Sequence, residues 1–170
     1  MQKSLTTGNS TLSYSIHGNG EPIVLIHGFG EDSRIWNQQV EYLQNNYRLI
    51  VPDLRGSGGS TLNESFLSIE SMAEDICLIL DEEKISNCIM LGHSMGGYIT
   101  LAFAENYPSY LKAFGLIHSS AYADSDEKKE ARRKSIAFIK EHSAFEFMKT
   151  TIPNLFAAGF NQLQKNKVDE

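Results

Sequence analysis

One seven-residue stretch constrains the fold of this chain more than any other. Residues 91–97 read Leu-Gly-His-Ser-Met-Gly-Gly, after an apolar run that ends at Leu91 and before a helical pattern from Met95 to Asn106. A Gly-x-Ser-x-Gly string between a strand and a helix is typical of the nucleophile elbow, a sharp turn that exposes the serine hydroxyl above a sheet. Both glycines are needed, because the turn brings strand and helix too close together for a Cβ atom on either side of the serine. Ser94 is therefore a candidate nucleophile.

The composition excludes several classes of protein. With 170 residues, of which 41% are hydrophobic and 21% charged, the chain is long enough for one globular domain with a buried core. The formal net charge of −6 argues against a nucleic-acid or anionic-membrane surface, which requires a basic patch. No apolar run approaches the ~18 residues of a membrane span, and the start of the chain lacks the apolar segment of a signal peptide. We expect a cytoplasmic protein with neither a nucleic-acid nor a membrane partner.

Apolar runs and helical patterns alternate along most of the chain. This alternation predicts an α/β fold, a three-layer α/β/α sandwich whose mostly parallel sheet has helices on both faces. Ser68 is the expected N-cap of the second helix, because serine is favoured at that position. The expected strands are residues 11–17, 22–26, 47–51, 87–91 and 111–117, and the expected helices are residues 35–43, 69–80 and 95–106.

The pattern changes after Ser119. From Asp124 to Ala158 the sequence shows only helical patterns, with Asp124 and Glu127 spaced as in a capping box. The residues from Asn161 onward are polar. We therefore expect three parts: the α/β core in residues 1–120, a helical segment in residues 121–160, and a polar tail in residues 161–170.

Glycine-containing motifs follow three of the expected strands. Residues 27–30 (His-Gly-Phe-Gly) follow strand 22–26, residues 53–60 (Asp-Leu-Arg-Gly-Ser-Gly-Gly-Ser) follow strand 47–51, and the Ser94 elbow follows a third strand. Ligands of such sheets bind outside the carboxyl ends of the strands, so the three motifs are expected to converge on one site. In the first motif, a glycine-rich turn can direct backbone N–H groups at a developing oxyanion.

These three motifs resemble those of the α/β-hydrolase family, in particular its small esterases, lipases and perhydrolases. The resemblance covers roughly residues 11–119 and implies that Ser94 is the nucleophile of acyl transfer from a small carboxylic ester to water. It also implies that the backbone N–H groups of Phe29 and Met95 form the oxyanion hole, and that no metal or organic cofactor is required. The segment that begins at Asp124 resembles the start of the family's lid.

The chain departs from the family pattern in its catalytic acid and histidine. In the family both follow strands that would lie beyond Glu170, so the chain is expected to be a truncated hydrolase that is inactive by itself. Within the chain, His118 at the end of strand 111–117 and Asp124 just past it are the alternative base and acid. Without further strands, strand 111–117 would be an open sheet edge. We therefore expect a homo-oligomer or pairing with the missing C-terminal segment.

Other functions and other histidine roles compete with this interpretation. A Gly-x-Gly turn at Gly28 with an acidic residue 25 positions later, Asp53, mimics a dinucleotide-binding fingerprint, although its third glycine is replaced by Ser33. A non-catalytic fragment or interaction module that retains only the fold is the second alternative. Of the remaining histidines, His27 is expected to support its loop through hydrogen bonds, and His93 is expected to be a packing residue.

Overall fold

The computed structural model describes residues 1–64 and 66–157 of the chain. The chain divides into two compact units, Met1–Ala121 and Tyr122–Glu170. Within the described ranges, none of the helices combines the length and the apolar character that a bilayer crossing requires.

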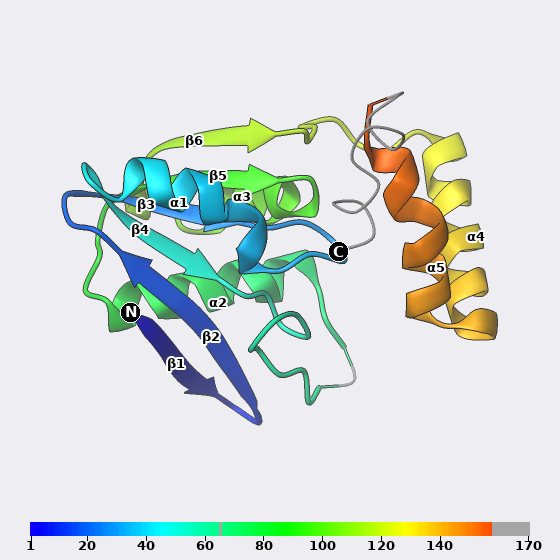
Figure 1. Cartoon of the computed structure of the whole chain (residues 1–170), viewed down its shortest axis with the longest axis horizontal. Coiled ribbons are helices and arrows are strands. Elements are labelled where there is room, and N and C mark those ends of the chain that lie inside the picture. Colours follow the sequence, from blue (N-terminus) through cyan, green and yellow to red (C-terminus); the bar gives the residue numbers. More distant parts are fainter. Residues whose placement is uncertain (65, 158–170) are drawn as a thin grey trace. The chain divides into compact units, whose positions relative to one another are not determined.

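A six-stranded mixed sheet forms the centre of the first unit, in the order β1-β2-β4-β3-β5-β6 (Figure 1). Strands β4, β3, β5 and β6 are parallel, which confirms the prediction of a mostly parallel sheet. Strands β1 and β2 form an antiparallel hairpin at one edge. The sequence patterns did not predict β1, because Leu5 is its one large apolar residue. The strands are β1 (Gln2–Thr7), β2 (Ser10–His17), β3 (Glu21–Ile26), β4 (Tyr47–Pro52), β5 (Cys88–His93) and β6 (Leu111–Ile117).

Helices cover both faces of the sheet, as expected. The predicted N-cap of α2 is confirmed, because the Ser68 hydroxyl accepts the backbone N–H of Ser71 at 3.1 Å and Ser71 reciprocates in a capping box. The prediction of one helix over residues 35–43 was wrong at its start, where a 3-10 turn precedes the α-helix because the Asp32 side chain caps the Arg34 N–H. The helices are η1 (Ser33–Trp36), α1 (Asn37–Leu43), α2 (Ile69–Glu82), α3 (Met95–Asn106) and η2 (Pro108–Tyr110).

Two apolar clusters fill the space between the layers. Alternate residues of one strand belong to different clusters, because successive side chains of a strand point to opposite faces. Val24 of β3 packs with α2 and α3 on one face, whereas Leu25 packs with Trp36 and Val40 on the other. Both faces of the parallel strands are therefore buried, which explains their continuous apolar runs.

Up to residue 157, where its described part ends, the second unit contains two helices and a 3-10 turn: α4 (Asp126–His142), α5 (Ala144–Thr151) and η3 (Ile152–Leu155). Helices α4 and α5 lie side by side, with the Phe138 and Phe147 rings 6.3 Å apart. The capping box expected at Asp124 and Glu127 was wrong: the N-cap is Ser125, whose hydroxyl accepts the Lys128 N–H. The tail expected at 161–170 lies outside the described residues.

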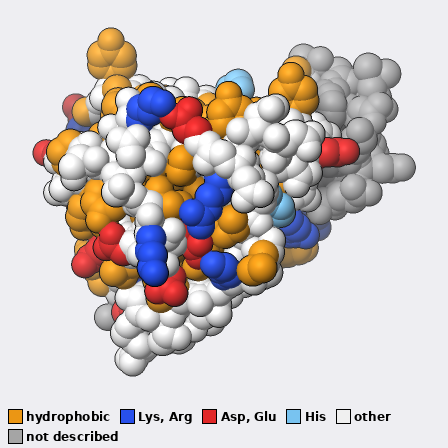
Figure 2. All heavy atoms as spheres, turned by 90° about the vertical axis from the view of Figure 1, so that its left-hand side faces the viewer, with side chains coloured by type: hydrophobic (Ala, Val, Ile, Leu, Met, Phe, Trp, Pro, Cys, Tyr) orange, Lys and Arg blue, Asp and Glu red, His pale blue; other side chains and the backbone are white. Residues whose placement is uncertain are grey.

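A mixed-charge surface lies at the amino ends of the parallel strands, where Figure 2 shows basic and acidic side chains interspersed with apolar ones. The buried Glu83 carboxylate, just after α2, binds Lys3 at 2.7 Å and Arg48 at 2.6 Å and accepts the Tyr14 hydroxyl at 2.7 Å. Burial alone would raise the pKa of Glu83, but these partners outweigh it and the pKa is lowered. This network joins β1, β2 and β4 to the end of α2.

The loop after β4 is fixed by a second buried ion pair. The Arg55 guanidinium binds both carboxylate oxygens of Asp75 on α2 at 2.6 Å and also contacts Glu64. Burial raises the pKa of the Asp75 carboxyl although Arg55 opposes the shift. Such a pair adds little net stability, yet removal of one partner leaves the other charge buried and uncompensated.

We expect Asp75→Ala to lower the free energy of unfolding by about 3 kcal/mol, because Arg55 would lose its buried counter-charge. Glu21→Ala, which breaks the exposed Lys112–Glu21 pair, is the control and should cost less than about 1 kcal/mol. Urea denaturation followed by circular dichroism measures both. Equal effects of the two substitutions would show that Arg55 finds another partner or leaves the interior.

Candidate functional site

Ser94 occupies a strained turn between β5 and α3. Its backbone angles are φ 52° and ψ −115°, in a region that non-glycine residues rarely adopt. Such a conformation costs about 1–3 kcal/mol and persists only where the surrounding structure enforces it. The turn is the strand-to-helix elbow that the sequence predicts.

Two glycines make this turn sterically feasible. A Cβ atom on Gly92 would lie 2.2 Å from the carbonyl oxygen of Gly96, and a Cβ atom on Gly96 would lie 2.5 Å from the carbonyl oxygen of Ile26. Both obstacles are backbone atoms, which cannot move without shifting β3 or α3. The close approach expected from the motif is therefore present on both sides of Ser94.

Residues at the end of β6 hold the Ser94 backbone through two hydrogen bonds. The Ser94 N–H donates to the carbonyl of Ile117 at 3.0 Å, and the Ser119 hydroxyl donates to the carbonyl of Ser94 at 2.7 Å. Sequence reasoning missed Ser119, because only the pairing of β6 with β5 brings it to the elbow. Both polar groups of the strained residue are satisfied, which helps to maintain its conformation.

The Ser94 side chain does not cap its helix. Ser94 precedes the first residue of α3, where serine hydroxyls commonly accept a backbone N–H, but its side chain makes no capping hydrogen bond. The hydroxyl is therefore not used to stabilise the helix. This geometry favours the nucleophile over an ordinary N-cap.

The loop after β3 lies directly against Ser94. Strands β3 and β5 are adjacent and parallel, so their carboxyl ends meet, and a Cβ atom on Gly28 would lie 3.0 Å from Cβ of Ser94. Phe29 follows with its ring exposed. Among the described residues, no hydrogen bond uses the backbone N–H of Phe29 or of Met95, and Met95 begins α3, where N–H groups lack intrahelical acceptors.

His27 supports this loop in its neutral form. It is fully buried; its Nδ1 lies 2.8 Å from the carbonyl oxygen of Gly28, and its Nε2 accepts the Leu54 N–H at 2.9 Å. One nitrogen must donate and the other accept, which defines the Nδ1–H tautomer. Burial lowers the pKa of His27, against the opposing hydrogen bond to Gly28. Both ring nitrogens are occupied, as expected of a supporting residue rather than a base.

Asp53 ties two loops together. One carboxylate oxygen accepts the Ser33 N–H at 2.9 Å and the other accepts the Gly59 N–H at 2.8 Å. A Cβ atom on Gly58, whose φ is 52°, would lie 2.3 Å from the Asp53 Cγ, so the carboxylate fills the turn. A dinucleotide would need this carboxylate for its ribose. Because both oxygens are already bonded, the geometry disfavours the dinucleotide alternative.

The His93 ring lies in a cluster of aromatic and acidic side chains beside the elbow. Its Nδ1 is 2.9 Å from Oε2 of Glu31, and its centroid is 6.4 Å from that of Trp36 and 6.0 Å from that of His118, both edge-on. His93 thus packs, as expected, but it also binds a carboxylate. Sequence reasoning did not assign Glu31 a role, although a charged residue next to a glycine-rich turn is a recognisable signal.

The two alternative base and acid residues differ in their surroundings. His118 is exposed at the end of β6, and among the described residues no hydrogen bond joins its ring to the Ser94 hydroxyl. Asp124 belongs to the second unit, where it binds Nε of Arg132 at 2.5 Å. This guanidinium lowers the pKa of the Asp124 carboxyl. Asp124 therefore already has a charged partner, and both residues stay predictions.

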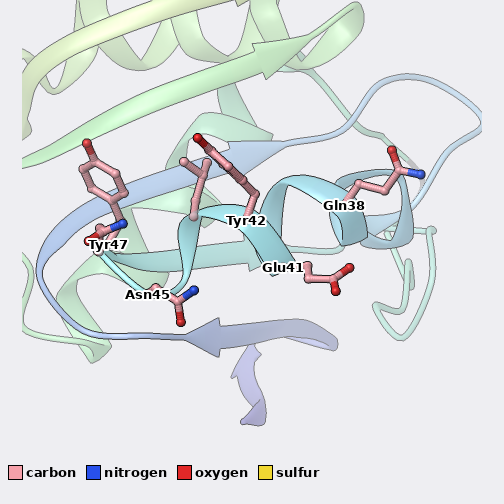
Figure 3. Close-up of a pocket in the computed structure, with 7 residues that line it drawn as sticks. Gln38, Glu41, Tyr42, Asn45 and Tyr47 are labelled. Atoms are coloured by element: carbon pink, nitrogen blue, oxygen red, sulfur yellow. The ribbon is translucent and has the colours of Figure 1, made fainter.

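A hollow of about 760 Å³ lies elsewhere, at the amino end of β4. Figure 3 shows its labelled side chains, which come from α1, the turn after it and the start of β4. Ser94 lies at the carboxyl ends of the strands, so this hollow is separate from the elbow. The lining residues are Gln38, Glu41, Tyr42, Leu43, Asn45, Asn46 and Tyr47.

Known proteins match this chain over most of its length. A family model described as alpha/beta hydrolase fold matches residues 21–146. The chain is 38% identical over 124 residues to karrikin insensitive 2 receptor IA of Petunia hybrida, covering 68% of this chain and 44% of the receptor. It is 31% identical over 142 residues to a pimeloyl-acyl-carrier-protein methyl ester esterase of Aeromonas hydrophila, covering 82% of this chain and 54% of the esterase.

A solved structure of a thermophilic esterase from Thermogutta terrifontis is similar to almost all of the chain. Its TM-score is 0.88 at 30% identity, and the match covers 99% of this chain and 64% of the esterase. The chain spans about half the length of the curated relatives that it matches.

We expect acid to weaken the contribution of His27 to stability. As the pH falls through 6.5, the ordinary pKa of histidine, the unfolded chain binds a proton that the buried ring resists, so the free energy of unfolding decreases. The stability advantage of the wild type over His27→Gln should shrink by up to about 1.4 kcal/mol per pH unit in this range. Urea titrations between pH 7.5 and 5.5 measure it, with exposed His142→Gln as the control. An advantage that is constant with pH would mean that His27 accepts a proton in the folded protein.

Proposed function

The chain belongs to the alpha/beta hydrolase fold family, and we propose that it carries the nucleophile and oxyanion hole of a serine hydrolase. The observation that carries this proposal is the strained Ser94, whose hydroxyl makes no capping hydrogen bond to α3 and which lies against the Gly28 loop. The proposed reaction is acyl transfer from a small carboxylic ester to water.

The geometry supports a two-step mechanism. The Ser94 oxygen attacks the ester carbonyl while a base takes its proton, and the carbonyl oxygen becomes an oxyanion that accepts hydrogen bonds from the N–H groups of Phe29 and Met95. The intermediate expels the alcohol, which takes up the proton, and leaves an acyl group on Ser94. Water then attacks this acyl-enzyme in the same way and releases the carboxylic acid. Neither step requires a metal or an organic cofactor.

Within the described residues, His118 and Asp124 are the alternatives for the base and the acid, and no hydrogen bond described there joins the His118 ring to the Ser94 hydroxyl. A serine hydroxyl without a base is almost entirely protonated at neutral pH and is a poor nucleophile. The 170-residue polypeptide alone is therefore proposed to hydrolyse esters near the background rate.

Relatives support an ester as the substrate and also indicate a second candidate function. The Aeromonas hydrophila relative is named a methyl ester esterase, and the Thermogutta terrifontis structure is that of an esterase. The Petunia hybrida relative, at 38% identity, is named a receptor. A binding protein that retains the fold is therefore the second candidate. The two candidate functions differ in turnover: an esterase releases product repeatedly, whereas a receptor only needs to bind its ligand.

We expect a fluorophosphonate probe to label Ser94 in the protein expressed from its whole reading frame. Ser94→Ala should abolish this labelling and lower the turnover of p-nitrophenyl acetate by about 10⁶-fold, as loss of a serine nucleophile does in other hydrolases. Peptide mass spectrometry locates the label, and Ser109→Ala, an exposed serine in η2, is the control for loss of a serine hydroxyl away from the elbow. Labelling that persists in Ser94→Ala would refute the nucleophile, whereas stoichiometric binding without turnover would favour the receptor.

We expect the 170-residue polypeptide to self-associate through β6. Among the described residues this strand pairs with β5 alone, and Phe114 on it is 48% exposed. Unpaired N–H and C=O groups beside apolar side chains favour pairing with another strand. Light scattering should give a mass above the 19.0 kDa monomer, and Phe114→Lys should shift it towards the monomer. Tyr42→Lys, on exposed α1, is the control. A monodisperse wild-type monomer would contradict this proposal.

A further inference from the structure

The carboxylate of Glu31 links the loop after β3 to the nucleophile elbow. Its Oε2 atom accepts the N–H of Gly28 at 2.7 Å and lies 2.9 Å from Nδ1 of His93, the residue immediately before Ser94. The Glu31 side chain is 23% exposed, so these contacts are partly shielded from water. The mechanism proposed above does not use this carboxylate.

Three groups converge on Gly28. A Cβ atom at this position would lie 2.8 Å from Oε2 of Glu31, 3.0 Å from Cβ of Ser94 and 3.3 Å from Nδ1 of His93. The next N–H along the chain is that of Phe29, one of the two proposed oxyanion donors. The direction of this donor depends on the peptide backbone of Gly28, which the Glu31 carboxylate holds.

An ionised carboxylate suits this position because it only accepts hydrogen bonds. Its oxygen can accept hydrogen bonds from both the Gly28 N–H and an N–H on Nδ1 of His93, and it does not have to bind a proton to do so. Hydrogen bonds to a charged acceptor are stronger than neutral ones. The His93 ring also has edge-on contacts with the rings of Trp36 and His118, which restrict its motion.

We propose that Glu31 is a positioning residue for acyl transfer. By joining Gly28 to His93, it fixes the Phe29 N–H at the distance from Ser94 that the oxyanion requires. Glu31 acts through these two neighbours and does not touch the reacting atoms. This role rests on the proposed function of Ser94.

The kinetic test uses the protein expressed from its whole reading frame, as for Ser94→Ala. It compares Glu31→Ala, Glu31→Gln and the control Glu41→Ala, an exposed carboxylate on α1. Glu31→Ala should lower kcat about ten-fold and leave KM within about two-fold, because a misplaced donor weakens the transition state more than substrate binding. Glu31→Gln should recover part of kcat, since its amide oxygen can still accept the Gly28 N–H. If Glu31 were only structural, Glu31→Ala would lower the melting temperature without lowering kcat selectively relative to KM.

A second measurement separates the failure of this proposal from that of the proposed function. Amide hydrogen exchange by NMR should be faster at Gly28 in Glu31→Ala and unchanged at Val24, in the core of β3. Wild-type kcat in Glu31→Ala overturns the positioning role, whatever happens to exchange. If the wild-type protein neither turns over ester nor labels at Ser94, the proposed function fails and the catalytic role of Glu31 fails with it, while faster Gly28 exchange still establishes the link.

Discussion

The site depends on one backbone constraint, the positive φ of Ser94. A residue at φ 52° and ψ −115° turns the chain from β5 into α3 within a single position and leaves its side chain free of the helix end. The turn is possible because Gly92 and Gly96 lack Cβ atoms that would collide with backbone carbonyls. The strain of about 1–3 kcal/mol is offset by the burial of the flanking strand and helix. The proposed function of Ser94 thus depends on a conformation that only the assembled sheet can enforce.

Hydrogen bonds from neighbouring loops surround this elbow. His27, as its Nδ1–H tautomer, joins the loop after β3 to the loop after β4. Asp53 makes a second connection between the same two loops. Glu31 then connects the first loop to the elbow itself. Polar groups that are fully bonded in a protein interior fix geometry more precisely than apolar packing alone. The proposed oxyanion donors, Phe29 N–H and Met95 N–H, therefore lie beside loops that these side chains fix.

Local sequence patterns predicted the elements that carry the site. The apolar run before Gly92 and the helical pattern after Ser94 identified β5 and α3, because both elements are buried and bounded by residues with strong conformational preferences. The polar edge strand β1 escaped prediction, since pairing with β2 rather than burial stabilises it. The contributions of Ser119 and Glu31 also escaped, because each acts on a residue more than 20 positions away. Contacts of this kind depend on strand order, which no short motif encodes.

The central claim is that the elbow aims the Ser94 oxygen between the backbone N–H groups of Phe29 and Met95. A crystal structure of the protein after reaction with a fluorophosphonate tests this directly, because the phosphoryl oxygen stands in for the oxyanion. Our account predicts phosphorus on Ser94 and this oxygen about 2.7–3.1 Å from both backbone nitrogens. A phosphoryl oxygen that points to solvent, or phosphorus on another residue, would contradict it.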